Sequence, residues 1–122
     1  MPALNFKKQF AAAVLEGRKA MTIRAKRKTP IKAGDTLYLY TGMRTKQCHR
    51  LRVVRCVRAR PIQMFLQPGK VLTIYLGGFE LSAREITKLA KRDGFTSPEQ
   101  FARFFNETNG AIFAGQVIEW RT

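Results

Sequence analysis

The chain has 122 residues, of which 45% are hydrophobic and 25% are charged, values typical of one globular domain that buries its core without metal or disulfides. It has no apolar run near the roughly 20 residues that a membrane helix requires. The first residues lack a secretory signal pattern, so a cytoplasmic protein is expected.

The formal net charge is +15, and the excess lies in the first part of the chain. Residues 1–70 hold 17 Lys/Arg and two acids, whereas residues 71–122 hold six basic and six acidic residues. Such a polarised basic surface predicts a nucleic-acid or phosphate partner. A membrane surface is not an expected partner, because no basic helix with a broad apolar face is present.

The N-terminal third is predicted to hold a strand, a helix and a second strand. Apolar spacing indicates a strand over 4–6 and a helix over 7–16, which Gly17 ends. Residues 20–25 alternate in polarity, as in a half-buried strand. Met21 and Ile23 are therefore expected in the core, with Thr22 and Arg24 sharing the opposite face, and Lys19 just before them.

The middle of the chain is predicted to be a series of strands joined by basic or polar loops. The strands are expected over 36–40, 50–60, 62–66 and 71–76. The arginine-rich strand 50–60 is expected to bulge at Val53-Val54 and to end its hydrogen bonding, or to start an edge, at Pro61.

The C-terminal part is predicted to hold two helices and a closing strand. Ser82 and Glu85 form a capping-box pattern at the start of a helix over 82–92. Ser97-Pro98 opens a second helix to about residue 107, with Phe101, Phe104 and Phe105 on its buried face. The last strand is expected over 112–120. Many short strands and few helices predict a small, mostly antiparallel barrel in the mixed α/β (α+β) class.

Two cysteines, Cys48 and Cys56, are expected to be free thiols in a chain without a secretory signal. His49 beside Cys48 suggests zinc, but a structural zinc site takes four ligands, and no Cys-x-x-Cys pair is present. We therefore expect no metal and no other cofactor.

The run Gly17-Arg18-Lys19, followed by Thr22-Ile23-Arg24 and then by 33–39 (Ala-Gly-Asp-Thr-Leu-Tyr-Leu), resembles the ASCH domain family. Segments 93–101 and 115–120 also resemble later parts of that family, so the resemblance covers nearly the whole chain in order. The loop 41–48 is similar to phage or prophage members. The resemblance implies a single PUA-like β-barrel domain over 1–122, with about three peripheral helices.

The resemblance also implies a function directed at RNA or a nucleotide, because PUA-like barrels generally bind RNA. Some small bacterial members are amidohydrolases that remove the acetyl group from the exocyclic amine of acetylcytidine, using a lysine, a threonine and a glutamate. Lys19 and Thr22 match the first two, and the glutamate position falls at Asp93, whose side chain is one methylene shorter. Another branch is reported as ribonuclease, with active residues that we do not match to this chain.

The chemistry of amide cleavage suits this set of residues. A threonine hydroxyl is a poor nucleophile until a base takes its proton, and a lysine is such a base only when neutral. Burial and the positive charges of Arg18 and Arg24 are expected to lower the pKa of Lys19, while Asp93 would raise it. The alternatives stay open at this stage: Lys19 as a phosphate contact, Thr22 as an ordinary strand residue and Asp93 as a helix end.

For binding without catalysis, basic residues of neighbouring loops and strand ends are candidates to contact phosphates, and a tyrosine is a candidate to stack on a base. They are Arg18, Arg24, Lys26, Arg27, Lys28, Arg44, Lys46, Arg50 and Tyr40. The first hypothesis is therefore an RNA- or nucleotide-binding domain, and the second is an acetylcytidine amidohydrolase. A ribonuclease or a phage interaction module is a further alternative. DNA is kept as an alternative ligand, and a monomer is favoured.

Overall fold

The computed structural model describes residues 2–121 as seven strands and three helices. In chain order these are β1 (Ala3–Phe6), α1 (Lys8–Leu15), β2 (Met21–Ala25), β3 (Thr36–Thr41), β4 (His49–Gln67), β5 (Lys70–Leu76), β6 (Phe79–Glu80), α2 (Ala83–Arg92), α3 (Pro98–Asn109) and β7 (Ile112–Trp120). This arrangement confirms the predicted α+β class. No helix in residues 2–121 is long and apolar enough to cross a membrane.

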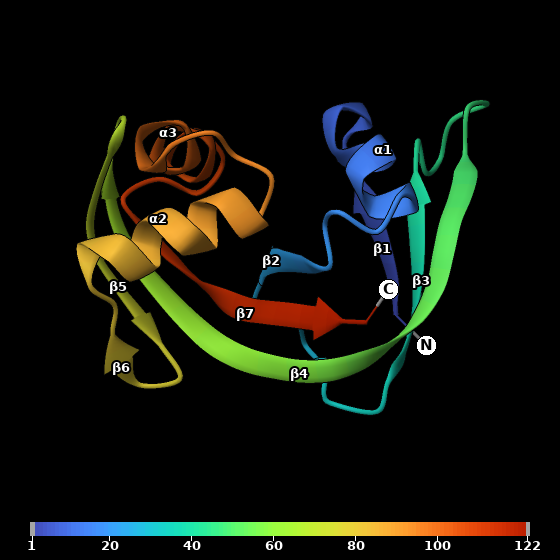
Figure 1. Cartoon of the computed structure of the whole chain (residues 1–122), viewed down its shortest axis with the longest axis horizontal. Helices are drawn as coiled ribbons and strands as arrows, with labels where there is room; N and C mark the ends of the chain where they lie inside the picture. The colour runs from blue at the N-terminus through green and yellow to red at the C-terminus, as the bar shows by residue number, and fades with distance from the viewer. Residues whose placement is uncertain (1, 122) are drawn as a thin grey trace.

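The sheet is organised by β4, which pairs with three other strands along its 19 residues. Its start pairs with β3, its middle with β7 and its end with β5. β2 adds to β7, β6 adds to β5, and β1 adds to β3 as the one parallel ladder among the described strands. Figure 1 shows β4 curving beneath the other elements, with α1 toward one end and α2 and α3 toward the other.

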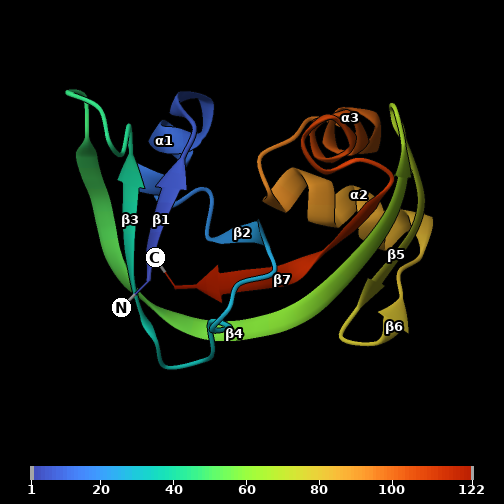
Figure 2. The same cartoon turned by 180° about the vertical axis from the view of Figure 1, so that it is seen from behind.

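The strands do not form a closed barrel. Over residues 2–121, the ladders run from β1 through β3 and β4 to β5 and β6, while β7 and β2 branch from β4. Closure would require β1 to pair with β2, and no such ladder is formed in the part of the chain that the structure describes. Figure 2, seen from behind, shows β1 and β2 separated at this opening.

Two predictions about β4 were wrong. The strand does not stop at Pro61, because the Pro61 carbonyl accepts from Gly77 N at 2.9 Å at the end of the β5 ladder, where its missing N–H costs little. Nor is there a bulge at Val53-Val54, since both residues pair in register with β3. Val54 is buried and Val53 is 47% exposed, so the alternation continues and only the residue type breaks the pattern.

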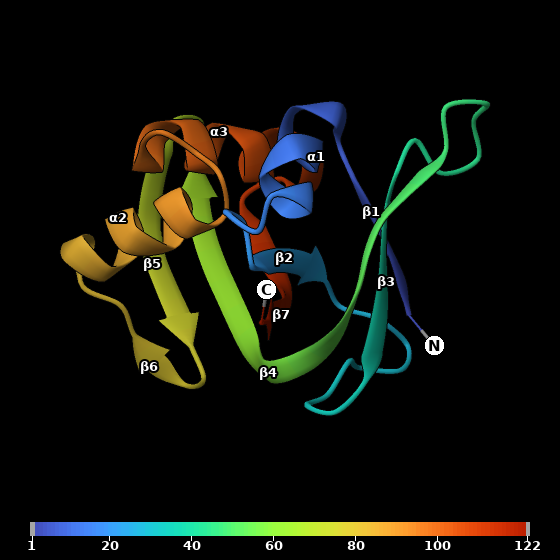
Figure 3. The same cartoon turned by 45° about the vertical axis from the view of Figure 1, so that its right-hand side comes forward.

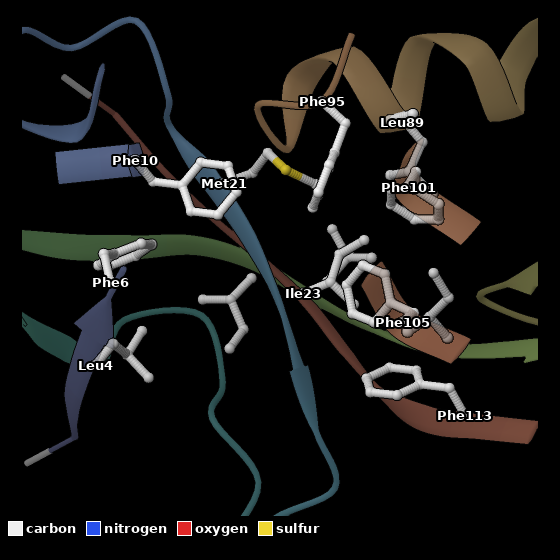
Figure 4. Close-up of a cluster of buried hydrophobic side chains, with 14 of the residues drawn as sticks. Leu4, Phe6, Phe10, Met21, Ile23, Leu89, Phe95, Phe101, Phe105 and Phe113 are labelled. Atoms are coloured by element: carbon white, nitrogen blue, oxygen red, sulfur yellow. The ribbon is translucent and has the colours of Figure 1, made fainter. Parts of the chain in front are cut away.

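A cluster of aromatic side chains holds the helices against the strands. Figure 4 shows Met21 and Ile23 pointing from β2 toward phenylalanines of the α2–α3 segment and β7. The Phe95 ring lies 5.6 Å from Phe101 between centroids, and Phe105 lies 5.1 Å from Phe113. The predicted core positions Met21 and Ile23 are confirmed as buried. This packing brings the end of α2 close to the segment that precedes β2.

The sequence signals for the two later helices are confirmed in detail. Ser82 and Glu85 form the complete capping box of α2, and the Ser97 side chain accepts from Gln100 N at 3.1 Å to cap α3. Figure 3 shows α2 and α3 over the β4–β5 end of the sheet, with α1 close to β2. The helix ends are thereby fixed where they meet β2.

Candidate functional site

Four polar side chains are buried among residues 2–121: Lys19, Thr22, Asp93 and Glu119. The exposed fraction of Lys19 is 3%, and that of Asp93 is 5%. A buried charge is costly unless it is paired and hydrogen-bonded, so such groups are the first to examine for function. Three of the four were candidates from the sequence.

Lys19 and Asp93 form a buried ion pair across 74 positions of sequence. Lys19 Nζ donates to Asp93 Oδ1 at 2.5 Å and to the Asp93 carbonyl oxygen at 2.7 Å. The Nζ also lies 5.2 Å from the centroid of the Phe10 ring and 5.9 Å from that of Phe6. The shorter aspartate therefore reaches the lysine, and the ammonium group is held between a carboxylate and two aromatic faces.

Local backbone structure places Asp93 at this point. Asp93 is the C-terminal cap of α2, and Gly94 then adopts a φ of +96° that turns the chain toward α3. A Cβ on Gly94 would lie 2.8 Å from Phe10 Cδ1, too close for a normal contact. Glycine at this position therefore supplies both the left-handed conformation and the close approach of α2 to α1.

Burial moves the pKa values of the pair toward each other. Burial lowers the pKa of Lys19 from its usual 10.5, against the charge and hydrogen bond of Asp93, and the charge of Arg24 lowers it further. Burial raises the pKa of Asp93 from its usual 3.8, against the effects of Lys19 and Arg24. A proton therefore passes between these two groups more readily than between a lysine and an aspartate on the surface.

Arg24 and Arg18 differ in their relation to this pair. The Arg24 guanidinium lies 4.6 Å from the centroid of Phe6, and its Nε donates to Thr22 Oγ1 at 3.0 Å. Arg18 is exposed and pairs with Glu16 at 2.9 Å, so it does not act on Lys19 as the sequence analysis expected. Because Thr22 Oγ1 accepts from Arg24, the hydroxyl keeps its own proton to donate elsewhere.

Lys19, Thr22, Arg24 and Asp93 line one pocket of about 350 Å³. Aromatic walls surround them, and exposed polar side chains form the rim. The walls are Phe6, Phe10, Phe95, Phe104, Phe105 and Phe113, and the rim is Asn5, Lys7, Thr108 and Asn109. The volume is at the small end of the range for ligand pockets, and the flat walls suit an aromatic ring.

Phe104 belongs to this pocket as well as to the core. It was expected on the buried face of its helix, but it is only half-buried, and Lys7 Nζ lies 4.7 Å from its ring centroid. Neighbouring helix positions point about 100° apart, so Phe104 and Phe105 do not share one direction. That spacing was the available signal that one of the two faces outward.

The other candidate binding residues lie away from the pocket. Lys26, Arg27 and Lys28 are exposed in the loop before β3, and Arg44 and Lys46 are exposed in the loop after it. β3 has six residues, so these groups stand at opposite ends of a strand about 17 Å long. Exposed Arg50 pairs in register with half-buried Tyr40 near the second group.

Glu119 is the buried polar residue that the sequence analysis missed. Its carboxylate accepts from Arg58 at 2.9 and 3.0 Å, from Arg60 at 3.0 Å and from Arg92 at 2.9 Å. These bonds join β4, β7 and the last turn of α2, next to Asp93. The signal in the sequence was a single acid within the apolar run Val117-Ile118-Glu119-Trp120.

In comparisons with protein-family models, with curated proteins and with solved structures, no match to the chain was found. Within residues 2–121, no group of three or more His, Cys, Asp and Glu side chains is arranged to hold a metal ion. The description of the site therefore rests on its own geometry.

We predict that removing either member of the buried pair alone destabilises the fold more than removing both. Asp93→Leu leaves an unpaired ammonium group in the interior and should lower the free energy of unfolding by about 3 kcal/mol. The double variant Lys19→Met/Asp93→Leu should recover part of this loss, because no uncompensated charge stays buried. Urea unfolding measures the effect, and additive losses in the double variant would contradict it.

We also predict an acid-dependent contribution from Glu119. Burial raises its pKa, but hydrogen bonds from Arg58 and Arg92 and their charges outweigh this and lower the pKa from 4.5 to about 2. The stabilisation is therefore full above pH 4.5 and is lost as the pH falls from 4.5 toward 2.

The size of this term is roughly 2 kcal/mol, because the partly exposed arginines are screened by solvent. Glu119→Gln should lower stability at pH 7 and flatten the stability profile between pH 5 and 2, relative to an exposed control, Glu107→Gln. Thermal unfolding over this pH range measures both variants. An unchanged profile for Glu119→Gln would show that its carboxylate does not carry the term.

Proposed function

We propose that the chain is an amidohydrolase that removes an acyl group from the exocyclic amine of a cytosine base. The observation that carries this proposal is the buried Lys19–Asp93 pair, which lies in the same aromatic pocket as the Thr22 hydroxyl. A lysine that only contacts phosphate would be exposed, and here 97% of it is covered. The pair and the hydroxyl supply a base, a proton donor and a nucleophile.

In this mechanism Thr22 Oγ1 attacks the acyl carbonyl carbon. Neutral Lys19 takes the hydroxyl proton, which its lowered pKa favours. Arg24, bonded to the same oxygen, provides a positive charge near the oxyanion that forms. Asp93, as the protonated carboxyl or through Lys19, gives a proton to the leaving amine, and water then hydrolyses the threonine ester.

The pocket walls support a base as the leaving part of the substrate. The rings of Phe6 and Phe10 flank Lys19, and Phe104 opens to the rim. A planar pyrimidine stacks on such faces, and a nucleoside sugar would then lie among the polar side chains of the rim. We propose on the same grounds that the open sheet is a PUA-like architecture of the ASCH type, in a cytoplasmic protein.

A second candidate function is RNA binding, and the exposed basic loops on either side of β3 favour it. Lys26, Arg27 and Lys28 at one end, with Arg44 and Lys46 at the other, would contact phosphates rather than a base. These side chains are not part of the 350 Å³ pocket. The two functions are compatible, because they use different surfaces.

Incubation of the protein with acetylcytidine, with cytidine release followed by chromatography, tests the proposal. Lys19→Met and Thr22→Val should each lower kcat by at least about 100-fold, because each removes a group that moves a proton or forms a bond. Lys8→Met, which removes an exposed lysine outside the pocket, should leave kcat unchanged.

Two other outcomes would redirect the account. Equal activity in Thr22→Val and in the parent protein would exclude the threonine as the nucleophile. No turnover, together with RNA binding whose log affinity falls by about 0.7 per phosphate contact with log salt, would favour the binding function.

A further inference from the structure

β2 is an edge strand whose free side faces the pocket. Among the described strands it pairs only with β7, and it does so without a register shift. Figure 2 shows β2 beside β7, with its other edge turned away from the sheet. An edge strand presents main-chain N–H and C=O groups that no strand has taken up.

The residues whose main chain faces outward follow from the ends of the ladder. Trp120 N donates to Ala20 O at 3.0 Å, and Lys26 N donates to Ala114 O at 3.1 Å. In an antiparallel ladder the bonded residues alternate, so even-numbered residues of β2 bond to β7. The N–H and C=O groups of Ile23 and Ala25 therefore point away from β7.

The pocket runs along this edge and not over one face of the strand. Its lining includes the consecutive residues 22–25, although neighbouring side chains of a strand point to opposite faces. Only an approach from the edge meets all four residues together. The outward main-chain groups of Ile23 and Ala25 are thus part of the wall that also holds Thr22.

We propose that the main chain of Ile23 and Ala25 reads the polar edge of a pyrimidine ring. This inference rests on the proposed function and adds how the base is recognised. The aromatic walls accept any flat ring, and the side chains named so far act on the acyl group. Main-chain donors and acceptors at the strand edge match the alternating acceptors and donors of a pyrimidine, and so select it. A pocket of about 350 Å³ is too small for an extended peptide to add to the strand.

Ala25→Pro isolates the main-chain donor. Proline removes the N–H that points into the pocket, and it leaves the bonds to β7 in place because Ala25 does not donate to β7. Ala25→Ser, at the same exposed position, keeps the N–H and is the matched control. Both variants should give the circular dichroism spectrum of the parent protein.

Cytidine binding, followed by calorimetry, tests the inference without any need for catalysis. Ala25→Pro should bind cytidine about tenfold more weakly than Ala25→Ser, as for the loss of one hydrogen bond to a group then left unpaired. The same loss should appear in kcat/KM for acetylcytidine but not for acetanilide, which has a flat ring without polar ring atoms. A steric effect of the proline ring would weaken both substrates equally and would overturn the inference.

The two proposals fail in different ways. Cytidine binding that depends on Ala25 N–H, without turnover of acetylcytidine, would leave the recognition of the base standing and remove the hydrolase. Turnover that is equal in Ala25→Pro and Ala25→Ser would keep the hydrolase and overturn recognition by the strand edge. If no cytidine binds to the parent protein, the inference is also overturned.

Discussion

The buried ion pair of Lys19 and Asp93 is the interaction on which the geometry of the site depends. It joins the segment before β2 to the end of α2, two parts of the chain that no strand ladder connects. The phenylalanines that exclude water from the pair also make it costly to leave either partner alone. The same burial that stabilises the core therefore gives the lysine a lowered pKa, and a structural contact becomes a candidate proton-transfer pair.

The second constraint is the open edge between β1 and β2. A closed barrel would fill this edge with another strand, and the main chain of β2 would then be satisfied within the sheet. Because the sheet branches at β7 instead, the edge, the buried pair and the aromatic walls share one pocket. Glu119 supports this arrangement from behind, since its arginines tie α2 to β4 and β7 beside Asp93.

The sequence predicted the elements and part of the site, and the limits have physical reasons. Capping signals at Ser82 and Ser97 are local, and both helices begin where those signals indicate. The contact between Lys19 and Asp93 spans most of the chain, so the resemblance suggested the residues but not their bond. The course of β4 through Pro61 was not predictable from the proline alone, because its cost depends on which neighbour lies alongside. Glu119 was missed because three arginines from distant segments, and not a local pattern, make its burial tolerable.

The most direct test of the account is the titration of Lys19 itself. NMR spectra of protein carrying ¹³C at lysine Cε, with Lys19→Met to assign the signal, give the pKa of each lysine side chain. The account predicts that the Lys19 signal titrates clearly below the usual lysine value of 10.5 and that Asp93→Asn changes its midpoint. A Lys19 signal that titrates together with the surface lysines would contradict the buried pair and the function built on it.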